Sequence, residues 1–236
     1  MDAIKTFPKF SIFFLVIMLL EIAGLTVIPS FHMVSKAFIM ASLIGFYIVT
    51  ARYQSNVFLT GLIFALLGDC FLLFTTDDFF IIGLCCFLVM QLCYTAAFNK
   101  KRKVPRNKDY IISAIIALFG ISVLVFLWNK LDGNPLPVTL YIIAICTMAI
   151  YAYLRHPKLR GYKMVLFGVV LFILSDTLIA LNKFQGKIQY GNIIIMVTYM
   201  IAQYAIVTGE VLSDMPRKSI KANKSVKPDS ALSRHK

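Results

Sequence analysis

Eight apolar runs follow one another along the chain, and their length is the strongest constraint on its fold. Each run is close to the ~20 mostly apolar residues that a helix needs to cross the hydrocarbon of a bilayer. The mean hydropathy is +0.80, and 59% of the 236 residues are hydrophobic, whereas soluble domains contain about 45–50% apolar residues. We therefore predict an all-α, polytopic transmembrane bundle of about eight helices.

The expected spans use so much of the chain that no separate soluble domain fits beside them. The second and sixth are the shortest, which is compatible with a tilted or partly interfacial position. We place the bundle in residues 1–212, followed by a basic tail at 213–236 whose polar composition is typical of disorder. The eight spans cover roughly residues 10–29, 34–50, 56–74, 80–98, 110–128, 138–153, 163–181 and 190–211.

The distribution of basic residues predicts how the bundle is oriented. With eight spans, 20 of the 24 lysines and arginines fall on the side that carries both termini. Cytoplasmic loops of membrane proteins have such an excess, so both termini are predicted to face the cytoplasm. The net charge of +13 therefore reflects topology, and no nucleic-acid partner is expected.

Two aspartates stand inside apolar runs in matching contexts. The segment "GLIFALLGD" ends at Asp69 and "GVVLFILSD" ends at Asp176, with Ser175 before the second acid. Spacings of seven and eight place each aspartate on the same helix face as the small residues, where a neighbouring helix can approach closely. Each also lies five residues before the predicted non-cytoplasmic end of its span. Because a carboxylate at membrane depth is costly, both aspartates are candidate site residues.

The helix after each aspartate also carries polar side chains at helical spacing. They are Gln91 and Tyr94 in the fourth span and Tyr199 and Gln203 in the eighth. This recurrence indicates a weak parallel 4+4 internal repeat, and it favours cavity lining over isolated interhelical contacts.

Three further charged residues have less specific contexts. Lys36 begins the second span, where it fits a lipid interface, a phosphate site and a pair with an aspartate equally well. Glu21 fits a site residue or a structural contact equally well. Glu210 ends the last span and is interpreted as an ordinary interfacial charge.

The sequence lacks the motifs of several enzyme classes. None of the three histidines falls within an expected span, and no HExxH pair, GxSxG elbow, Walker A loop or GxGxxG motif occurs. No metal or other cofactor is therefore expected. Two buried carboxyl groups with nearby tyrosines and glutamines fit acid–base catalysis or, as the alternative, proton-coupled transport by Asp69 and Asp176.

Four segments resemble the YhhN-like family of membrane proteins, the lysoplasmalogenases. They are "GLIFALLGDCFLLF", "MQLCYTAAF", "LFILSDTLIALNKF" and "VTYMIAQYAIV", and the similarity covers most of the eight-span core. The resemblance implies hydrolysis of the vinyl ether bond of lysoplasmalogen, which releases a fatty aldehyde and glycerophospho-ethanolamine or -choline. The family motif carries over to Lys36, Asp69, Tyr94, Asp176, Asn182, Tyr199 and Gln203.

The resemblance also implies roles and partners. Asp69 and Asp176 would be the catalytic pair, one as a protonated acid and one as an ionised base. We expect Asp69 to be the acid, since Ser175 and Thr177 offer hydroxyl groups that stabilise an anion at Asp176. Lys36 or Gln91 would hold the phosphate. The expected partners are a lysophospholipid and the bilayer, an oligomer is compatible with the sequence, and family analogy favours the endoplasmic reticulum membrane.

Overall fold

The chain folds into a bundle of helices, as the hydropathy pattern predicts. The computed structural model describes residues 3–27, 29–74, 76–131 and 135–215, with the backbone alone for 3–5 and 29–31. A short 3₁₀ turn, Trp128–Lys130, follows the fifth helix. The α-helices within these residues are α1 (Ala3–Thr26), α2 (Pro29–Thr50), α3 (Asn56–Phe71), α4 (Asp77–Asn99), α5 (Asn107–Leu127), α6 (Leu136–Leu154), α7 (Tyr162–Phe184) and α8 (Gly191–Ser213).

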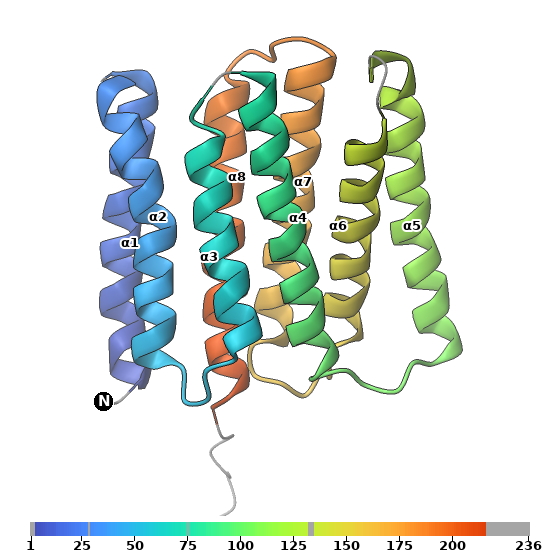
Figure 1. Cartoon of the computed structure of the whole chain (residues 1–236). Coiled ribbons are helices and arrows are strands. Elements are labelled where there is room, and N and C mark those ends of the chain that lie inside the picture. The colour runs from blue at the N-terminus through green and yellow to red at the C-terminus, as the bar shows by residue number, and fades with distance from the viewer. Residues whose placement is uncertain (1–2, 28, 75, 132–134, 216–236) are drawn as a thin grey trace, which may run out of the picture.

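The helices run side by side, and their connections alternate between the two ends of the bundle (Figure 1). The pair α1 and α2 forms one edge, α5 lies at the other, and α8 passes behind α3. Of the long apolar helices, α8 is the most buried and α5 the least. The start of α1 and the end of α8 lie at the same end of the bundle, which agrees with an even number of spans.

Seven of the described helices are long and apolar enough to cross a membrane, so the protein is a multi-pass membrane protein. The prediction that the second and sixth spans are short is wrong for α2, which has 22 residues because it begins at Pro29. Proline fits the first turn of a helix, where its missing N–H has no intrahelical partner. The short helix is α3, with 16 residues.

The end of α3 changes the predicted placement of the aspartates. Because α3 ends at Phe71, Asp69 lies two residues from the helix end. Asp176 lies eight residues before Phe184, the last residue of α7. The predicted equal distance of the two acids from the ends of their helices is therefore wrong.

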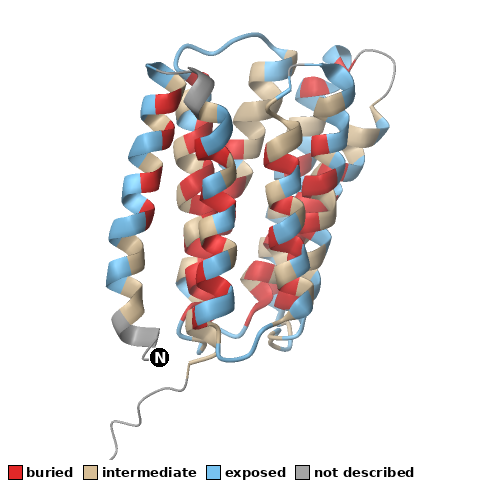
Figure 2. Ribbon diagram, turned by 60° about the vertical axis from the view of Figure 1, so that its left-hand side comes forward, coloured by how far each residue is buried: buried red, intermediate tan, exposed pale blue. Residues whose placement is uncertain are grey.

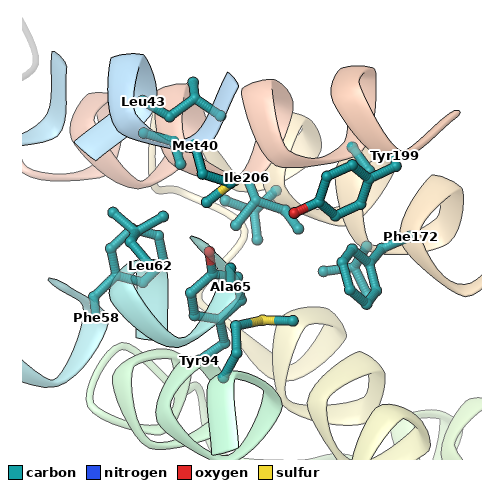
Figure 3. Packing of buried hydrophobic residues seen from close by; sticks show 14 of the residues in the cluster. Met40, Leu43, Phe58, Leu62, Ala65, Tyr94, Phe172, Tyr199 and Ile206 are labelled. Atoms are coloured by element: carbon teal, nitrogen blue, oxygen red, sulfur yellow. The ribbon is translucent and has the colours of Figure 1, made fainter. Parts of the chain in front are cut away.

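Buried residues gather on the helix faces that point towards the bundle interior, and exposed residues cover the outer faces (Figure 2). The interior is rich in aromatic rings. Phe58 of α3 stacks on Tyr94 of α4 with ring centroids 4.7 Å apart, and Phe172 of α7 packs against Tyr199 of α8 at 6.0 Å. Figure 3 shows these side chains around one common core.

The helices that carry the aspartates pack closely on the helices that follow them, α3 on α4 and α7 on α8. Glycine makes this possible. A β-carbon at Gly168 would lie 2.7 Å from the Ala202 carbonyl oxygen, and one at Gly61 would lie 2.9 Å from the Tyr94 ring. The prediction that small residues allow close approach on the aspartate face is confirmed.

A cluster of charges fastens the end of the bundle at which α8 ends. The buried Arg155 guanidinium donates to Glu210 Oε2 at 2.7 Å, and Lys101 Nζ lies 2.7 Å from both Glu210 Oε1 and Asp214 Oδ1. Glu210 is only 1% exposed, so its interpretation as an ordinary interfacial charge is wrong. The reason is that Arg155, which follows α6, folds back against α8.

Alanine substitution at two glycines should change stability in opposite directions. Gly168→Ala is expected to lower the free energy of unfolding by about 1–3 kcal/mol, because the new methyl group meets the backbone of α8. Gly45→Ala has nothing within 4 Å of the new β-carbon and should raise it by about 0.5–1 kcal/mol through helix propensity. Unfolding in mixed SDS micelles measures both, and equal shifts would contradict the close contact of α7 and α8.

Removing one partner of the buried ion pair should cost more than removing both. Arg155→Met is expected to destabilise the protein by about 3 kcal/mol, because the Glu210 carboxylate stays buried without its arginine. In the double variant Arg155→Met/Glu210→Met, part of this loss should be recovered. The same unfolding assay completes the double-mutant cycle, and strictly additive losses would show that the two side chains do not interact.

Candidate active site

Asp69 is held at the centre of the bundle by a tyrosine from another helix. Its side chain on α3 is 2% exposed, and the Tyr199 hydroxyl of α8 donates to Asp69 Oδ2 at 2.7 Å. The Lys36 ammonium on α2 attracts this carboxylate, and Glu21 on α1 repels it. The carboxyl group of Asp69 thus has one hydrogen-bond donor and one nearby positive charge.

Asp176 has a different tyrosine, and none of the basic residues that the structure describes lies within ion-pair distance of it. The Tyr141 hydroxyl of α6 donates to Asp176 Oδ2 at 2.5 Å, and the fully buried Gln91 carboxamide of α4 lies near the same hydroxyl. Asp69 is close enough to repel an ionised Asp176. The two carboxyl groups therefore belong to one electrostatic site with unequal surroundings.

An apolar pocket lies beside Asp176. Asp176 and Tyr141 are part of its wall, whereas Asp69 is not. Phe87 lines the pocket and also meets the Tyr199 ring edge-on, with centroids 6.1 Å apart, so it adjoins both halves of the site. The remaining wall comes from α4, α5, α6, α7 and Leu72: Phe80, Leu84, Phe119, Gly120, Val123, Leu127, Val138, Ile142, Ile145, Cys146, Ile173, Thr177, Ile179, Ala180 and Phe184.

A second polar group lies between α1 and α2. Glu21 is fully buried, accepts a hydrogen bond from the Ser35 hydroxyl and lies 2.8 Å from His32 Nδ1. The prediction that no histidine falls within a span is wrong for His32, because α2 begins at Pro29. Lys36, 8% exposed, has no ion-pair partner within 4.0 Å among the described residues.

The other predicted site residues contact neighbouring helices. Tyr94 donates to Gln203 Oε1 at 3.0 Å, and both side chains are fully buried. Ser175 donates to the Ile195 carbonyl oxygen at 3.1 Å. Asn182 binds the connection between α7 and α8 through the Ile188 N–H at 2.9 Å, so it lies apart from the two aspartates.

The expected stabilisation of Asp176 by adjacent hydroxyls is wrong. Ser175 and Thr177 both donate to backbone carbonyl oxygens, Thr177 to Ile173 at 2.8 Å, and neither reaches the carboxylate. The donor is Tyr141, which the sequence interpretation missed because it considered only helices that follow an aspartate. The feature of the sequence that could have indicated this donor is the phenol of Tyr141 itself, a polar group inside the expected span 138–153.

Among the residues that the structure describes, no three or more histidine, cysteine, aspartate or glutamate side chains gather in a way that could hold a metal ion. The site consists of two carboxyl groups, two phenols, a carboxamide and a lysine beside an apolar pocket. Such groups can give and take protons and can stabilise a nearby cation.

Comparison with known proteins places these residues in a family. The model of the YhhN family matches residues 31–210, which includes both aspartates. The chain is 28% identical to lysoplasmalogenase TMEM86A of Bos taurus over 199 residues, 80% of this chain and 78% of that protein. The human protein of the same name is 26% identical over the same shares.

A bacterial protein is similar over a shorter stretch. Lysoplasmalogenase of Mycobacterium bovis is 29% identical over 135 residues, 55% of this chain and 50% of that protein. No solved structure matches the chain.

Proposed function

The chain belongs to the YhhN family, and from this premise we propose that it is a lysoplasmalogenase, which hydrolyses the vinyl ether bond of a lysoplasmalogen in the membrane. The similar proteins named lysoplasmalogenase support this function. The observation that carries the proposal is the pair of carboxyl groups. Each accepts a hydrogen bond from a tyrosine, and the carboxyl group of Asp176 lines an apolar pocket. The expected products are a fatty aldehyde and glycerophospho-ethanolamine or -choline.

The surroundings of the two acids favour a division of roles. Asp176 lines the pocket that would hold the alkenyl chain, and none of the described basic residues pairs with it, so we assign it as the acid. Asp69 lies outside the pocket wall, and its carboxylate is attracted by the Lys36 ammonium, so we assign it as the base. This reverses the assignment expected from the sequence, whose basis was the hydroxyls beside Asp176.

The proposed reaction starts with proton transfer from Asp176 to the alkenyl carbon that is distal to oxygen. This gives an oxocarbenium ion, which the negative charge of Asp69 stabilises, as carboxylates do in glycosidases. Asp69 then takes a proton from a water molecule, whose oxygen adds to the carbon next to the ether oxygen. The product of this step is a hemiacetal, and Asp176 is ionised while Asp69 is protonated.

Collapse of the hemiacetal returns both groups to their starting states. Asp176 takes the proton of the hemiacetal hydroxyl, and Asp69 protonates the leaving glycerol oxygen. The bond between that oxygen and the hemiacetal carbon breaks. One water molecule is consumed, and one aldehyde and one alcohol are formed. No redox change occurs, and every proton transfer is general acid–base catalysis.

The remaining predicted residues support these two acids. We propose that Tyr199 orients Asp69, and that Gln91 orients the Tyr141 hydroxyl against Asp176. The pair Tyr94 and Gln203 would position α4 on α8. Ser175 and Asn182 would act in the same way on α7 and its connection to α8, as positioning residues with no direct part in proton transfer.

We propose that both termini face the cytoplasm, since the basic loops lie at the end where α1 begins and α8 ends. The pocket lies nearer the opposite end, towards the lumen or exterior. The endoplasmic reticulum membrane is the compartment that family analogy favours.

The first prediction for this function concerns the two carboxyl groups. Purified protein in detergent should release aldehyde from a lysoplasmenyl-ethanolamine and leave the saturated-ether analogue unchanged. Asp69→Asn and Asp176→Asn should each lower kcat by at least about 100-fold, because each removes a proton-transfer group. Asp214→Asn, at the other end of the bundle, is the matched control and should keep its activity. A folded wild type that releases no aldehyde would refute the proposed function.

A second prediction concerns Tyr141, which no sequence motif indicated. Tyr141→Phe should lower kcat by about tenfold with little change in KM, because the phenol orients the acid without carrying binding energy. Tyr110→Phe is the control, since Tyr110 is 65% exposed on α5. Steady-state aldehyde release measures both variants. An increase in KM alone would assign Tyr141 to substrate binding instead.

A further inference from the structure

An ion pair that the proposed reaction does not use lies against the pocket wall. Phe80 at the start of α4 and Phe184 at the end of α7 line the pocket, and their rings meet edge-on at 6.4 Å. Lys183 Nζ lies 4.9 Å from the centroid of the Phe80 ring and 2.6 Å from Asp77 Oδ1. A lysine and an aspartate therefore stand directly beside a wall residue of the apolar pocket.

This ion pair lies on the same helix face as the proposed acid. Lys183 follows Asp176 by seven residues on α7, which is nearly two complete turns and a rise of about 10 Å. The helix face between them lines the pocket through Ile179 and Ala180. The acid thus lines the pocket, and the lysine lies next to the wall residue Phe184 at the end of α7.

The spacing matches a lysoplasmalogen that lies along this face. In an extended chain three bonds cover about 3.8 Å, so the seven bonds from the distal alkenyl carbon to phosphorus cover roughly 9 Å. With that carbon at Asp176, the phosphate lies within reach of the flexible Lys183 side chain. The alkenyl tail then points into the apolar part of the pocket, and the head group points out of it.

The present partner of Lys183 is easily exchanged. The Asp77 side chain is 85% exposed and that of Lys183 34%, and an exposed ion pair of this kind contributes little to stability. A phosphate offers several charged acceptor oxygens to the ammonium group. Once Lys183 turns to a phosphate, the Asp77 carboxylate is free to accept from another cation.

We propose that Lys183 and Asp77 form the head-group subsite for a zwitterionic lysophospholipid. Lys183 binds the phosphate, and Asp77 accepts a hydrogen bond from the primary ammonium of an ethanolamine head group. The two side chains pair with each other when no substrate is bound. This assignment rests on the proposed function, and it differs from the sequence expectation that Lys36 or Gln91 holds the phosphate.

Lysine variants test the phosphate contact. Lys183→Gln should raise KM for lysoplasmenyl-ethanolamine about five- to tenfold with kcat unchanged, because a charge-assisted contact made throughout the reaction is lost. The KM for a 1-alkenylglycerol, which has the same vinyl ether and no phosphate, should stay the same. Lys183→Arg should stay within about twofold of wild type for both substrates. Lys187→Gln, on the same side of the bundle, is the matched control. If Lys183→Gln changes KM equally for the two substrates, or for neither of them, the proposed subsite is overturned.

Equilibrium binding separates this proposal from the proposed function. In lipid nanodiscs, Lys183→Gln should raise the Kd of the saturated-ether lysophospholipid about five- to tenfold and leave that of the matching alkylglycerol unchanged. Neither ligand can be hydrolysed, so the comparison holds even for a protein that releases no aldehyde. An unchanged Kd for the lysophospholipid overturns the subsite, whereas lack of hydrolysis with this Kd shift overturns only the enzyme assignment.

The aspartate is tested through head-group preference. Choline has no N–H group, so Asp77→Asn should weaken binding of the ethanolamine ligand about threefold more than binding of the choline ligand. The ratio of the two Kd values then moves towards equal affinity. A ratio that is the same in wild type and variant overturns the role of Asp77.

Discussion

In the interior of a membrane bundle a carboxyl group finds no bulk water, so it must find its partner on another part of the protein. Four acids of the bundle follow this rule. Asp69 on α3 is bound by α8, Asp176 on α7 by α6, and Glu21 on α1 by α2. Glu210 on α8 is bound by Arg155, just beyond α6. Each bond joins parts of the chain that the lipid would otherwise leave free to separate, so the polar contacts and the helix arrangement depend on one another.

The close packing of α7 on α8 and of α3 on α4 holds in place the two helices that carry the aspartates. Gly168 brings the backbone of α8 next to α7, and Gly61 brings the Tyr94 ring onto α3. Bulky side chains at these positions would move the helices that carry Asp69 and Asp176 away from their neighbours. The glycines therefore act on the chemistry indirectly, by setting the distance between helices whose side chains meet.

The two aspartates look alike in the sequence but have different surroundings in the fold. Asp69 shares its site with Lys36 and Tyr199, while Asp176 faces an apolar pocket together with Tyr141. Such a difference is what acid–base catalysis by two identical side chains requires, because one must start protonated and the other ionised. Along α7 the acid is followed by the wall residues Ile179 and Ala180 and then by Lys183, the order that the proposed subsite assigns to the ether and head group of a lysophospholipid.

The sequence by itself determined the membrane class, the number of helices, the clustering of basic residues on one side and the two aspartates that stand out within apolar runs. These follow from hydropathy and from charge, which are properties of each segment alone. Helix ends were less predictable. The second span was expected to begin at residue 34, but α2 begins at Pro29, and the third was expected to end at residue 74, but α3 ends at Phe71. Prolines and polar turns shift helix ends without changing the hydropathy much. The tertiary structure alone decided that Tyr141 binds Asp176 and that Asp77 meets Lys183. Those partners are 35 and 106 residues apart, and no local pattern records which faces of distant helices come together.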